Sequence, residues 1–196
     1  MIFLDSFRHR WATNAGKENK DIKTLFIVRH AKSSWSEPHL SDHDRPLNKR
    51  GRRDAPFMAQ FCAKRIEPGI ESKNIALLSS TAVRAHSTAM EFAKALGMDK
   101  DTVFQEEDLY LSDEMETLDI VKTAPDDYDT LMLFGHNPGF TYFANRLCEL
   151  QIDNIPTCGV VCARLNIDKW MDTAFGKGEK IFFEYPKKYY KEPLSE

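Results

Sequence analysis

Short apolar runs alternate along this chain with segments whose apolar residues recur at helical spacing. The runs are TLFIV (24–28), NIALLSS (74–80) and DTLMLFG (129–135), and helical spacing marks residues 49–64 and 82–96. A short continuous apolar run is typical of a strand buried on both faces. Strands that alternate with helices favour an α/β fold with a mostly parallel sheet. We therefore expect a three-layer α/β/α sandwich.

Further segments extend this pattern toward the carboxyl terminus. Residues 102–110 predict a short strand and a loop, residues 113–124 and 140–150 predict helices, and residues 159–167 and 179–186 are late strand candidates. In the helix over 113–124, Met115, Leu118 and Val121 are expected to share one face. We expect Ser79, Ser80 or Thr81 to cap the helix that begins near residue 82, and Gly97 to end it.

The chain has 196 residues, a length that fits one domain with a real core. Residues 1–23 are polar, lack sustained periodicity and are expected to form an extension. We expect the folded domain to span residues 24–186 and a charged tail to follow over residues 187–196.

Charge and cysteine content narrow the classes of function. A net charge of −3 argues against a general binder of nucleic acid or anionic membranes. No apolar run approaches the roughly 18 residues of a membrane span, and residues 1–23 lack the apolar stretch of a signal peptide. The cysteines Cys62, Cys148, Cys158 and Cys162 form no CxxC pair, which favours buried reduced thiols and a cytoplasmic protein.

Cationic and imidazole groups follow three of the predicted strands. Arg29 and His30 come after 24–28, Arg84 lies in the first turn after 74–80, and His136 follows 129–135. The carboxyl ends of parallel strands share one edge, where α/β proteins bind ligands. Guanidinium groups match phosphate oxygens two at a time, and a helix amino terminus near Thr81 adds N–H groups. The sequence thus predicts a site for a phosphoryl dianion.

Histidine at such a site can act as a nucleophile toward phosphorus. A second Arg-His pair, Arg8 and His9, follows no apolar run and has no partners at comparable spacing. We therefore expect chemistry at His30 and not at His9.

Four blocks carry a resemblance to a known family: LFIVRHAKSSW, SDHDRPLNKRGRRDA, LLSSTAVRAHSTA and LMLFGHNPG. In this order and spacing, over about residues 24–167, they resemble the histidine phosphatase superfamily, which has the phosphoglycerate mutase-like fold, and within it the SixA-like phosphohistidine phosphatases. The resemblance implies that His30 is the phosphorylated nucleophile, that Arg29 and Arg84 hold the phosphate, and that His136 is the second imidazole. It also implies that Arg45 binds substrate, and that the enzyme uses no metal or cofactor. The expected partner is a phosphorylated protein side chain or a small phosphorylated molecule.

Two positions depart from the family pattern. Ala31 replaces the glycine that usually follows the Arg-His pair, which leaves the backbone slightly less free. The mutase-like relatives also supply a carboxylic acid for the leaving group. The corresponding segment here offers five carboxylates without a clear choice, namely Glu106, Glu107, Asp108, Asp113 and Glu114. A phosphohistidine substrate needs a strong acid less, because imidazole leaves more easily than an alkoxide.

Competing interpretations remain open from the sequence. A phosphate-sensing or phosphoprotein-binding module without turnover is one alternative, and a phosphoglycerate mutase-type enzyme is another, although the interval between His30 and His136 holds no room for a large cap. The basic run 48–54 is read as a helix start in preference to a docking patch. A metal site at Asp42, His43, Asp44 and His39 is disfavoured because neighbouring loop residues lack the required geometry.

Overall fold

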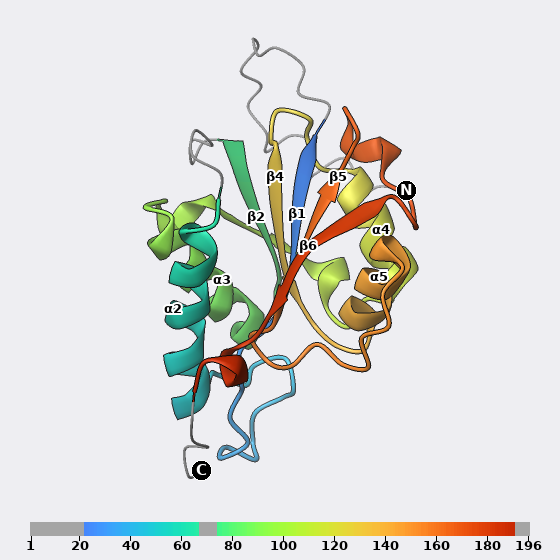
Figure 1. Ribbon diagram of the computed structural model, residues 1–196. Coiled ribbons are helices and arrows are strands. Elements are labelled where there is room, and N and C mark those ends of the chain that lie inside the picture. Colours follow the sequence, from blue (N-terminus) through green and yellow to red (C-terminus); the bar gives the residue numbers. More distant parts are fainter. Residues whose placement is uncertain (1–21, 67–73, 191–196) are drawn as a thin grey trace.

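A six-stranded sheet forms the centre of the computed structural model, which describes residues 22–66 and 74–190. The strands lie in the order β3-β2-β4-β1-β5-β6. Their bounds are β1 Lys23–Arg29, β2 Ile75–Ser80, β3 Val103–Glu106, β4 Thr130–Gly135, β5 Val160–Leu165 and β6 Gly178–Glu184. The helices α2 (Lys49–Ala63) and α3 (Val83–Ala95) lie on one side of the sheet in Figure 1, and α4 (Glu114–Lys122) and α5 (Gly139–Cys148) lie on the other. The predicted α/β/α sandwich is confirmed.

The sheet is parallel where the predicted site lies. β3, β2, β4 and β1 pair in parallel, and β1 pairs with β4 across more than a hundred residues of sequence, as in Arg29 opposite Gly135. At the other edge, β5 pairs antiparallel with β1, and β6 pairs antiparallel with β5. Because β1, β2 and β4 are parallel neighbours, the residues that follow them emerge at one edge of the sheet.

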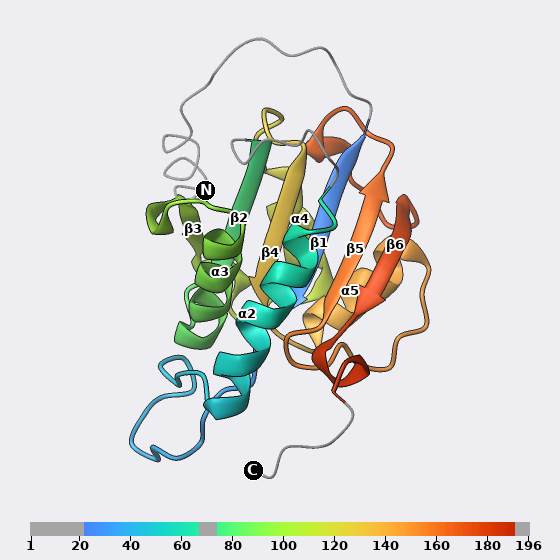
Figure 2. The same cartoon turned by 60° about the vertical axis from the view of Figure 1, so that its left-hand side comes forward.

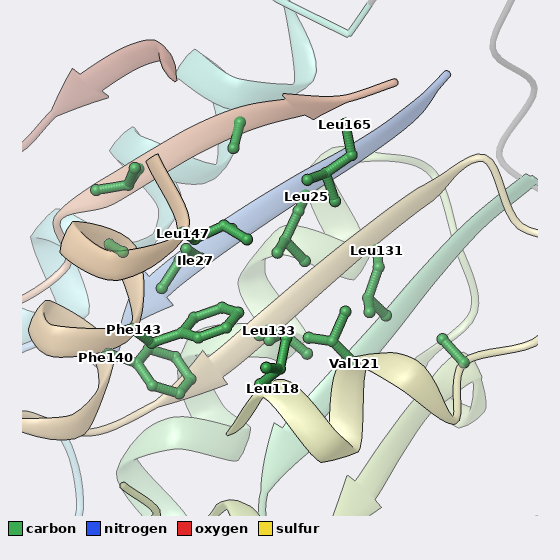
Figure 3. Packing of buried hydrophobic residues seen from close by; sticks show 14 of the residues in the cluster. Leu25, Ile27, Leu118, Val121, Leu131, Leu133, Phe140, Phe143, Leu147 and Leu165 are labelled. Atoms are coloured by element: carbon green, nitrogen blue, oxygen red, sulfur yellow. The ribbon is translucent and has the colours of Figure 1, made fainter. Parts of the chain in front are cut away.

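Strand periodicity divides the core into two halves. Successive side chains of a strand point to opposite faces, so Leu25 and Ile27 of β1 pack toward α4 and α5, as do Leu131 and Leu133 of β4. Figure 3 shows these residues meeting Leu118 and Val121 of α4 and Phe140, Phe143 and Leu147 of α5. Burial of such side chains on both faces explains why the strands read as continuous apolar runs.

The intervening residues of the same strands face α2 and α3. Phe26, Val28, Met132 and Phe134 pack there against Met58, Ala59, Phe92 and other buried residues of the two helices. Phe92 meets Phe134 edge to face at 5.0 Å between ring centroids. Figure 2 shows α2 and α3 crossing the front of the sheet, with the 31–48 connection extending beyond the strand ends.

Met115 is exposed although Leu118 and Val121 of the same helical face are buried, because α4 begins at Glu114 and only its later turns reach the core. One local prediction was wrong. None of Ser79, Ser80 and Thr81 caps α3, whose N-cap is Ala82 without a side-chain hydrogen bond. Ser80 belongs to the strand end, where its hydroxyl accepts from the Ala82 amide and contacts His136.

Two further local expectations agree with the structure. β1 begins at Lys23, the last residue of the segment expected to form the extension, and the 187–196 segment is described only to residue 190. The expected extension over residues 1–23 lies outside the described residues up to residue 21. The basic run is a helix start, as predicted, because the Asn48 side chain caps α2 by accepting from the Gly51 amide. All four cysteines are buried free thiols, also as predicted.

Gly51 fixes the path of the chain beyond β1. A Cβ atom at this position would lie 2.2 Å from the carbonyl oxygen of Lys32. That carbonyl accepts a hydrogen bond from the Asn48 amide at 3.0 Å. The first turn of α2 is therefore pressed against the backbone that follows His30, and this contact requires glycine.

Candidate active site

Three strand ends bring their basic side chains together. The Nε atom of Arg84 lies 3.3 Å from Nε2 of His30, and its Nη2 lies 3.3 Å from Nδ1 of His136. The two imidazole rings are 5.1 Å apart between centroids. His30, Arg84 and His136 are all buried. Together with Arg29 and Arg45, described below, they form what we call the strand-end cluster.

Hydrogen bonds define which nitrogen of His30 is available. Nδ1 lies 2.7 Å from the carbonyl oxygen of Ala31. A carbonyl can only accept, so Nδ1 carries the proton and donates. In the neutral ring, Nε2 then holds a lone pair, and it accepts from Nε of Arg84. The basic nitrogen of His30 therefore faces the guanidinium group of Arg84.

The same reasoning fixes the tautomer of His136. Arg84 can only donate, so Nδ1 of His136 accepts and Nε2 carries the proton. Nε2 donates to the hydroxyl oxygen of Ser80 at 2.9 Å. Ser80 stands at the end of β2 and holds the ring of His136 in place. Sequence reasoning assigned this serine to a helix cap and missed its contact with His136.

Burial keeps both imidazoles neutral. Removal from water, helped by the charges of Arg84, Arg29 and Arg45, lowers the pKa of His30 to about 3 against the opposing effect of the Ala31 hydrogen bond. Burial likewise lowers the pKa of His136 to about 2, with His30 and Arg84 acting in the same direction. A neutral imidazole beside guanidinium groups has a free lone pair at physiological pH.

Arg29 is held by the loop before β5. Its Nη1 donates to the carbonyl of Ile155 at 2.7 Å and to Oδ1 of Asn154 at 3.2 Å. Asn137, which follows His136, donates from Nδ2 to the same two acceptors. Arg29 is close enough to His30 for its charge to lower the pKa of that ring. The Nε atom of Arg29 is buried and has no hydrogen-bond partner among the described residues.

Arg45 reaches the cluster from the loop between β1 and α2. Its buried guanidinium group stacks on the indole of Trp35, with its central carbon 3.4 Å from the ring centroid. Its Nη2 forms an ion pair with Oδ1 of Asp42 at 2.8 Å. Trp35 itself is exposed, so the indole shields one face of Arg45 from solvent.

Ala31 is accommodated without backbone strain. The residue is buried and is absent from the positions with positive φ, so it does not need the conformational freedom of glycine. Its amide donates to Oγ1 of Thr88 at 3.0 Å, and this hydroxyl donates to the carbonyl of Arg84 at 2.7 Å. Thr88 thus ties the backbone after His30 to the helix that carries Arg84.

The carboxylate of the cluster comes from an unexpected loop. None of Glu106, Glu107, Asp108, Asp113 and Glu114 has a hydrogen bond or ion pair to the strand-end cluster within the described parts of the chain. Asp113 caps α4 and Glu114 pairs with Arg146. Asp42 is the acid that makes contact, since its Oδ2 lies 2.8 Å from Nη2 of Arg84.

Tyr110 is the third residue, after Ser80 and Asp42, whose place at the site was not predicted from the sequence. It comes from the segment searched for an acid, and its hydroxyl donates to Oδ2 of Asp42 at 2.9 Å. Its ring stands edge-on to His136 at 5.4 Å between centroids. A polar aromatic residue at the carboxyl end of a strand was the available signal.

The loop over residues 39–44 carries the side chains that were considered for a metal site. Within residues 22–66 and 74–190, no group of three or more histidine, cysteine, aspartate or glutamate side chains could hold a metal ion. His43 instead contacts Oγ1 of Thr81 through Nε2 at 2.9 Å and Asp44 through Nδ1. No helix in the described residues is long and apolar enough to cross a membrane.

Comparison with known proteins places this chain in a family. The model of the histidine phosphatase superfamily (branch 1) matches residues 25–141, which include every residue of the strand-end cluster. The chain belongs to the histidine phosphatase superfamily. The family resemblance read from the four sequence blocks is thereby confirmed.

Relatives by sequence include two uncharacterised proteins. An uncharacterised chloroplastic protein of Arabidopsis thaliana is 29% identical over 157 residues, which cover 76% of this chain and 69% of the relative. An uncharacterised protein of Mycobacterium leprae is 28% identical over 173 residues, which cover 82% of this chain and all of the relative.

Solved structures of superfamily members share the fold. A SixA-type protein from Agrobacterium tumefaciens matches with a TM-score of 0.66 and 24% identity, over 84% of this chain and 98% of that one. The protein histidine phosphatase SixA complexed with tungstate gives the same TM-score at 19% identity, over 84% and 98% of the two chains. A mycobacterial glucosyl-3-phosphoglycerate phosphatase matches less closely, with a TM-score of 0.52 and 14% identity over 73% and 90%.

Proposed function

We propose that the protein is a metal-independent phosphatase that acts through a phosphohistidine intermediate at His30, with a protein-bound phosphohistidine as its substrate. The observation that carries this proposal is the position of the His30 lone pair, which faces Arg84 while Nδ1 is engaged by Ala31. A neutral, oriented imidazole surrounded by guanidinium groups has the properties of a nucleophile for phosphoryl transfer.

In the first step, Nε2 of His30 attacks phosphorus and the bond to the leaving group breaks with its electron pair. Arg84, Arg29 and Arg45 offset the charge on the phosphoryl oxygens, as electrostatic stabilisation requires. In the second step, a water molecule attacks the phosphorus of phospho-His30. The P–Nε2 bond breaks and its electron pair returns to the ring. One proton of the water moves to a phosphoryl oxygen, so that dihydrogen phosphate leaves and the neutral, Nδ1-protonated ring is restored.

The available acids support phosphohistidine as the substrate class. None of the five candidate acids in residues 106–114 contacts the strand-end cluster within the described residues, and the pKa of Asp42 is lowered. Partial burial raises that pKa, but the Tyr110 hydroxyl and the charges of Arg84 and Arg45 outweigh it. A site with an ionised carboxylate suits a leaving group that departs without a proton, such as an imidazole already protonated on its distal nitrogen.

Oxyanion binding by a structural neighbour supports the anion site. The protein histidine phosphatase SixA that matches at 19% identity was solved in complex with tungstate, a tetrahedral oxyanion like phosphate. We propose that the strand-end cluster of this chain binds the same class of anion. The arrangement of Arg84 against both imidazoles, with three guanidinium groups in total, supports this assignment.

Hydrolysis assays test the proposal directly. The purified protein should hydrolyse a phosphohistidine peptide and, more slowly, an aryl phosphate, with equal rates with and without a chelator. His30→Ala should abolish both activities, and brief incubation of the wild type should yield an acid-labile phosphoprotein. His39→Ala is a matched control, because this histidine is exposed and lies outside the cluster. Residual hydrolysis by His30→Ala comparable to the wild type would exclude the mechanism.

A further inference from the structure

A carboxylate bridges two of the three guanidinium groups proposed to bind phosphate, those of Arg84 and Arg45. Oδ1 of Asp42 lies 2.8 Å from Nη2 of Arg45, and Oδ2 lies 2.8 Å from Nη2 of Arg84. The Nη1 group of Arg84 also donates to the backbone carbonyl of Asp42. Two buried cations thus share one carboxylate, in the way that they would share two oxygens of a phosphoryl group.

A third donor converges on the same carboxylate. The hydroxyl of Tyr110 donates to Oδ2 at 2.9 Å, so this oxygen accepts from both Tyr110 and Arg84. The Tyr110 ring packs edge-on against His136 and also against His43, at 5.0 Å between centroids for the latter. These contacts orient the hydroxyl toward the cluster.

Asp42 leaves donors of the cluster unpaired. Within the described residues, Nε and Nη1 of Arg45 are buried without a hydrogen-bond partner, and so is Nε of Arg29. Buried donors are normally satisfied, and each one left without an acceptor is unfavourable. A carboxylate has two oxygens, whereas a bound phosphoryl group presents three. The donor set is therefore larger than the carboxylate can use.

The side chain of Asp42 can leave without disturbing the fold. It is 44% exposed, in contrast to 3% for Arg84 and 9% for Arg45. The backbone on each side of Asp42 is held by other contacts, because before it the Glu37 carbonyl accepts from the Leu40 amide, and after it the His43 carbonyl accepts from the Val83 amide. Rotation of this exposed side chain toward water breaks its carboxylate contacts with both arginines, while the Asp42 backbone carbonyl can still accept from Nη1 of Arg84.

We propose that Asp42 is a resident anion of the phosphate site, which the phosphoryl group displaces, and that the Tyr110 hydroxyl then donates to a phosphoryl oxygen. The inference rests on the proposed function, because it concerns the same anion site. Asp42 acts as a positioning residue that holds Arg84 and Arg45 at the spacing of two anion oxygens. Tyr110 acts as a further substrate-binding residue.

Displacement has a quantitative signature. If every anion must first displace the carboxylate, the apparent dissociation constant is the intrinsic one divided by the fraction of protein with Asp42 displaced. Removing the carboxylate then tightens all anions by one common factor, whatever their charge. A carboxylate that stayed in place would act by repulsion, and the factor for a dianion would be about the square of that for a monoanion.

Tungstate and perrhenate provide matched probes, since both are tetrahedral oxyanions and their charges are −2 and −1. Calorimetric titration of Asp42→Asn should show both anions binding about tenfold more tightly than to the wild type, a factor that corresponds to a modest displacement equilibrium. Asp44→Asn is the control, because Asp44 lies two residues away with the same charge and hydrogen-bonds Ser41 and His43 instead. It should leave both affinities near their wild-type values.

Tyr110→Phe tests the second half of the proposal. In the Asp42→Asn background, it should weaken tungstate binding about tenfold, as expected for a hydrogen bond to a charged group. Unchanged tungstate affinity would remove Tyr110 from the site. For Asp42, unchanged or weaker anion binding in Asp42→Asn would contradict displacement. So would a gain in tungstate affinity that is about the square of the gain in perrhenate affinity.

A crystal of the wild-type protein soaked in tungstate gives a measurement that needs no variant. The Asp42 carboxylate should have left both guanidinium groups, and a retained Asp42 contact with a bound tungstate would contradict the inference. These readouts are independent of turnover. A protein that binds tungstate by displacement but hydrolyses no phosphohistidine would disprove the proposed function and leave this inference standing.

Discussion

The Nε2 atom of His30 accepts a hydrogen bond from Nε of Arg84 at 3.3 Å, across 54 residues of sequence. The same guanidinium group contacts His136 and Asp42, so one side chain connects two imidazoles and a carboxylate. Arginine alone supplies enough donors in one plane for these contacts. Replacing Arg84, or a residue that supports this arrangement, should therefore have a measurable effect on catalysis, binding or stability.

Arg84→Lys should lower kcat/KM for a phosphohistidine peptide by about a hundredfold or more, because a single ammonium group cannot replace the planar fork. Steady-state kinetics check this, with Arg146→Lys as the control. Arg146 forms an exposed ion pair with Glu114 outside the cluster, and its conservative replacement should leave kcat/KM near the wild-type value. Equal kinetics for Arg84→Lys and the wild type would remove Arg84 from the site.

Stability should fall in acid partly because of the two buried imidazoles. The folded protein holds His30 and His136 with lowered pKa values, near 3 and 2, whereas the unfolded chain takes up protons below about pH 6.5. The unfolded state therefore binds more protons between these limits, and stability drops as pH falls from about 6.5 toward 3. Each imidazole contributes a slope of up to about 1.4 kcal/mol per pH unit.

Urea denaturation at several pH values measures this slope. His30→Asn removes one titrating group, so the stability difference between wild type and variant should shrink or reverse as the pH falls. A pH-independent difference for His30→Asn would contradict a lowered pKa.

Thr88→Val should destabilise the protein by about 1–3 kcal/mol, since it leaves the buried Ala31 amide without its acceptor. It should also lower kcat, because the backbone that carries His30 loses its link to α3. Thr130→Val is an isosteric control, since the Thr130 hydroxyl is buried with no hydrogen-bond partner among the described residues. Thr130→Val should leave stability unchanged or raise it. A comparable loss of stability at both positions would show that the Thr88 hydrogen bond to Ala31 is not the cause. Thermal denaturation and kinetics provide both readouts.

Trp35→Ala should weaken orthophosphate binding about twofold to fivefold, because Arg45 loses the indole against which it stacks. Trp35→Phe keeps an aromatic face and should restore most of the affinity. Calorimetry or product inhibition by phosphate measures the effect. Equal loss of phosphate affinity in the Ala and Phe variants would show that stacking of Arg45 on an aromatic ring is not what Trp35 contributes.

Much of the fold followed from periodicity. Runs such as Leu25–Val28 are buried on both faces, so their apolar character was visible without any knowledge of neighbours. Met115 shows the limit of the same reasoning, because helical spacing gave its direction but not where α4 begins relative to the core. The antiparallel pairing of β5 with β1 and with β6 was not predicted either, since a strand's own residues do not reveal the direction of its partner.

The sequence by itself determined that Arg29, His30, Arg84 and His136 follow strands, and the rule that parallel strands end together made their meeting predictable. Only the tertiary structure decided which carboxylate, phenol and hydroxyl join them. Asp42 and Tyr110 lie on connections that have no periodicity, and Ser80 was open to a cap role that it does not fill. Their positions depend on long-range contacts such as the Val83 amide with the His43 carbonyl, and local sequence does not encode such contacts in a readable pattern.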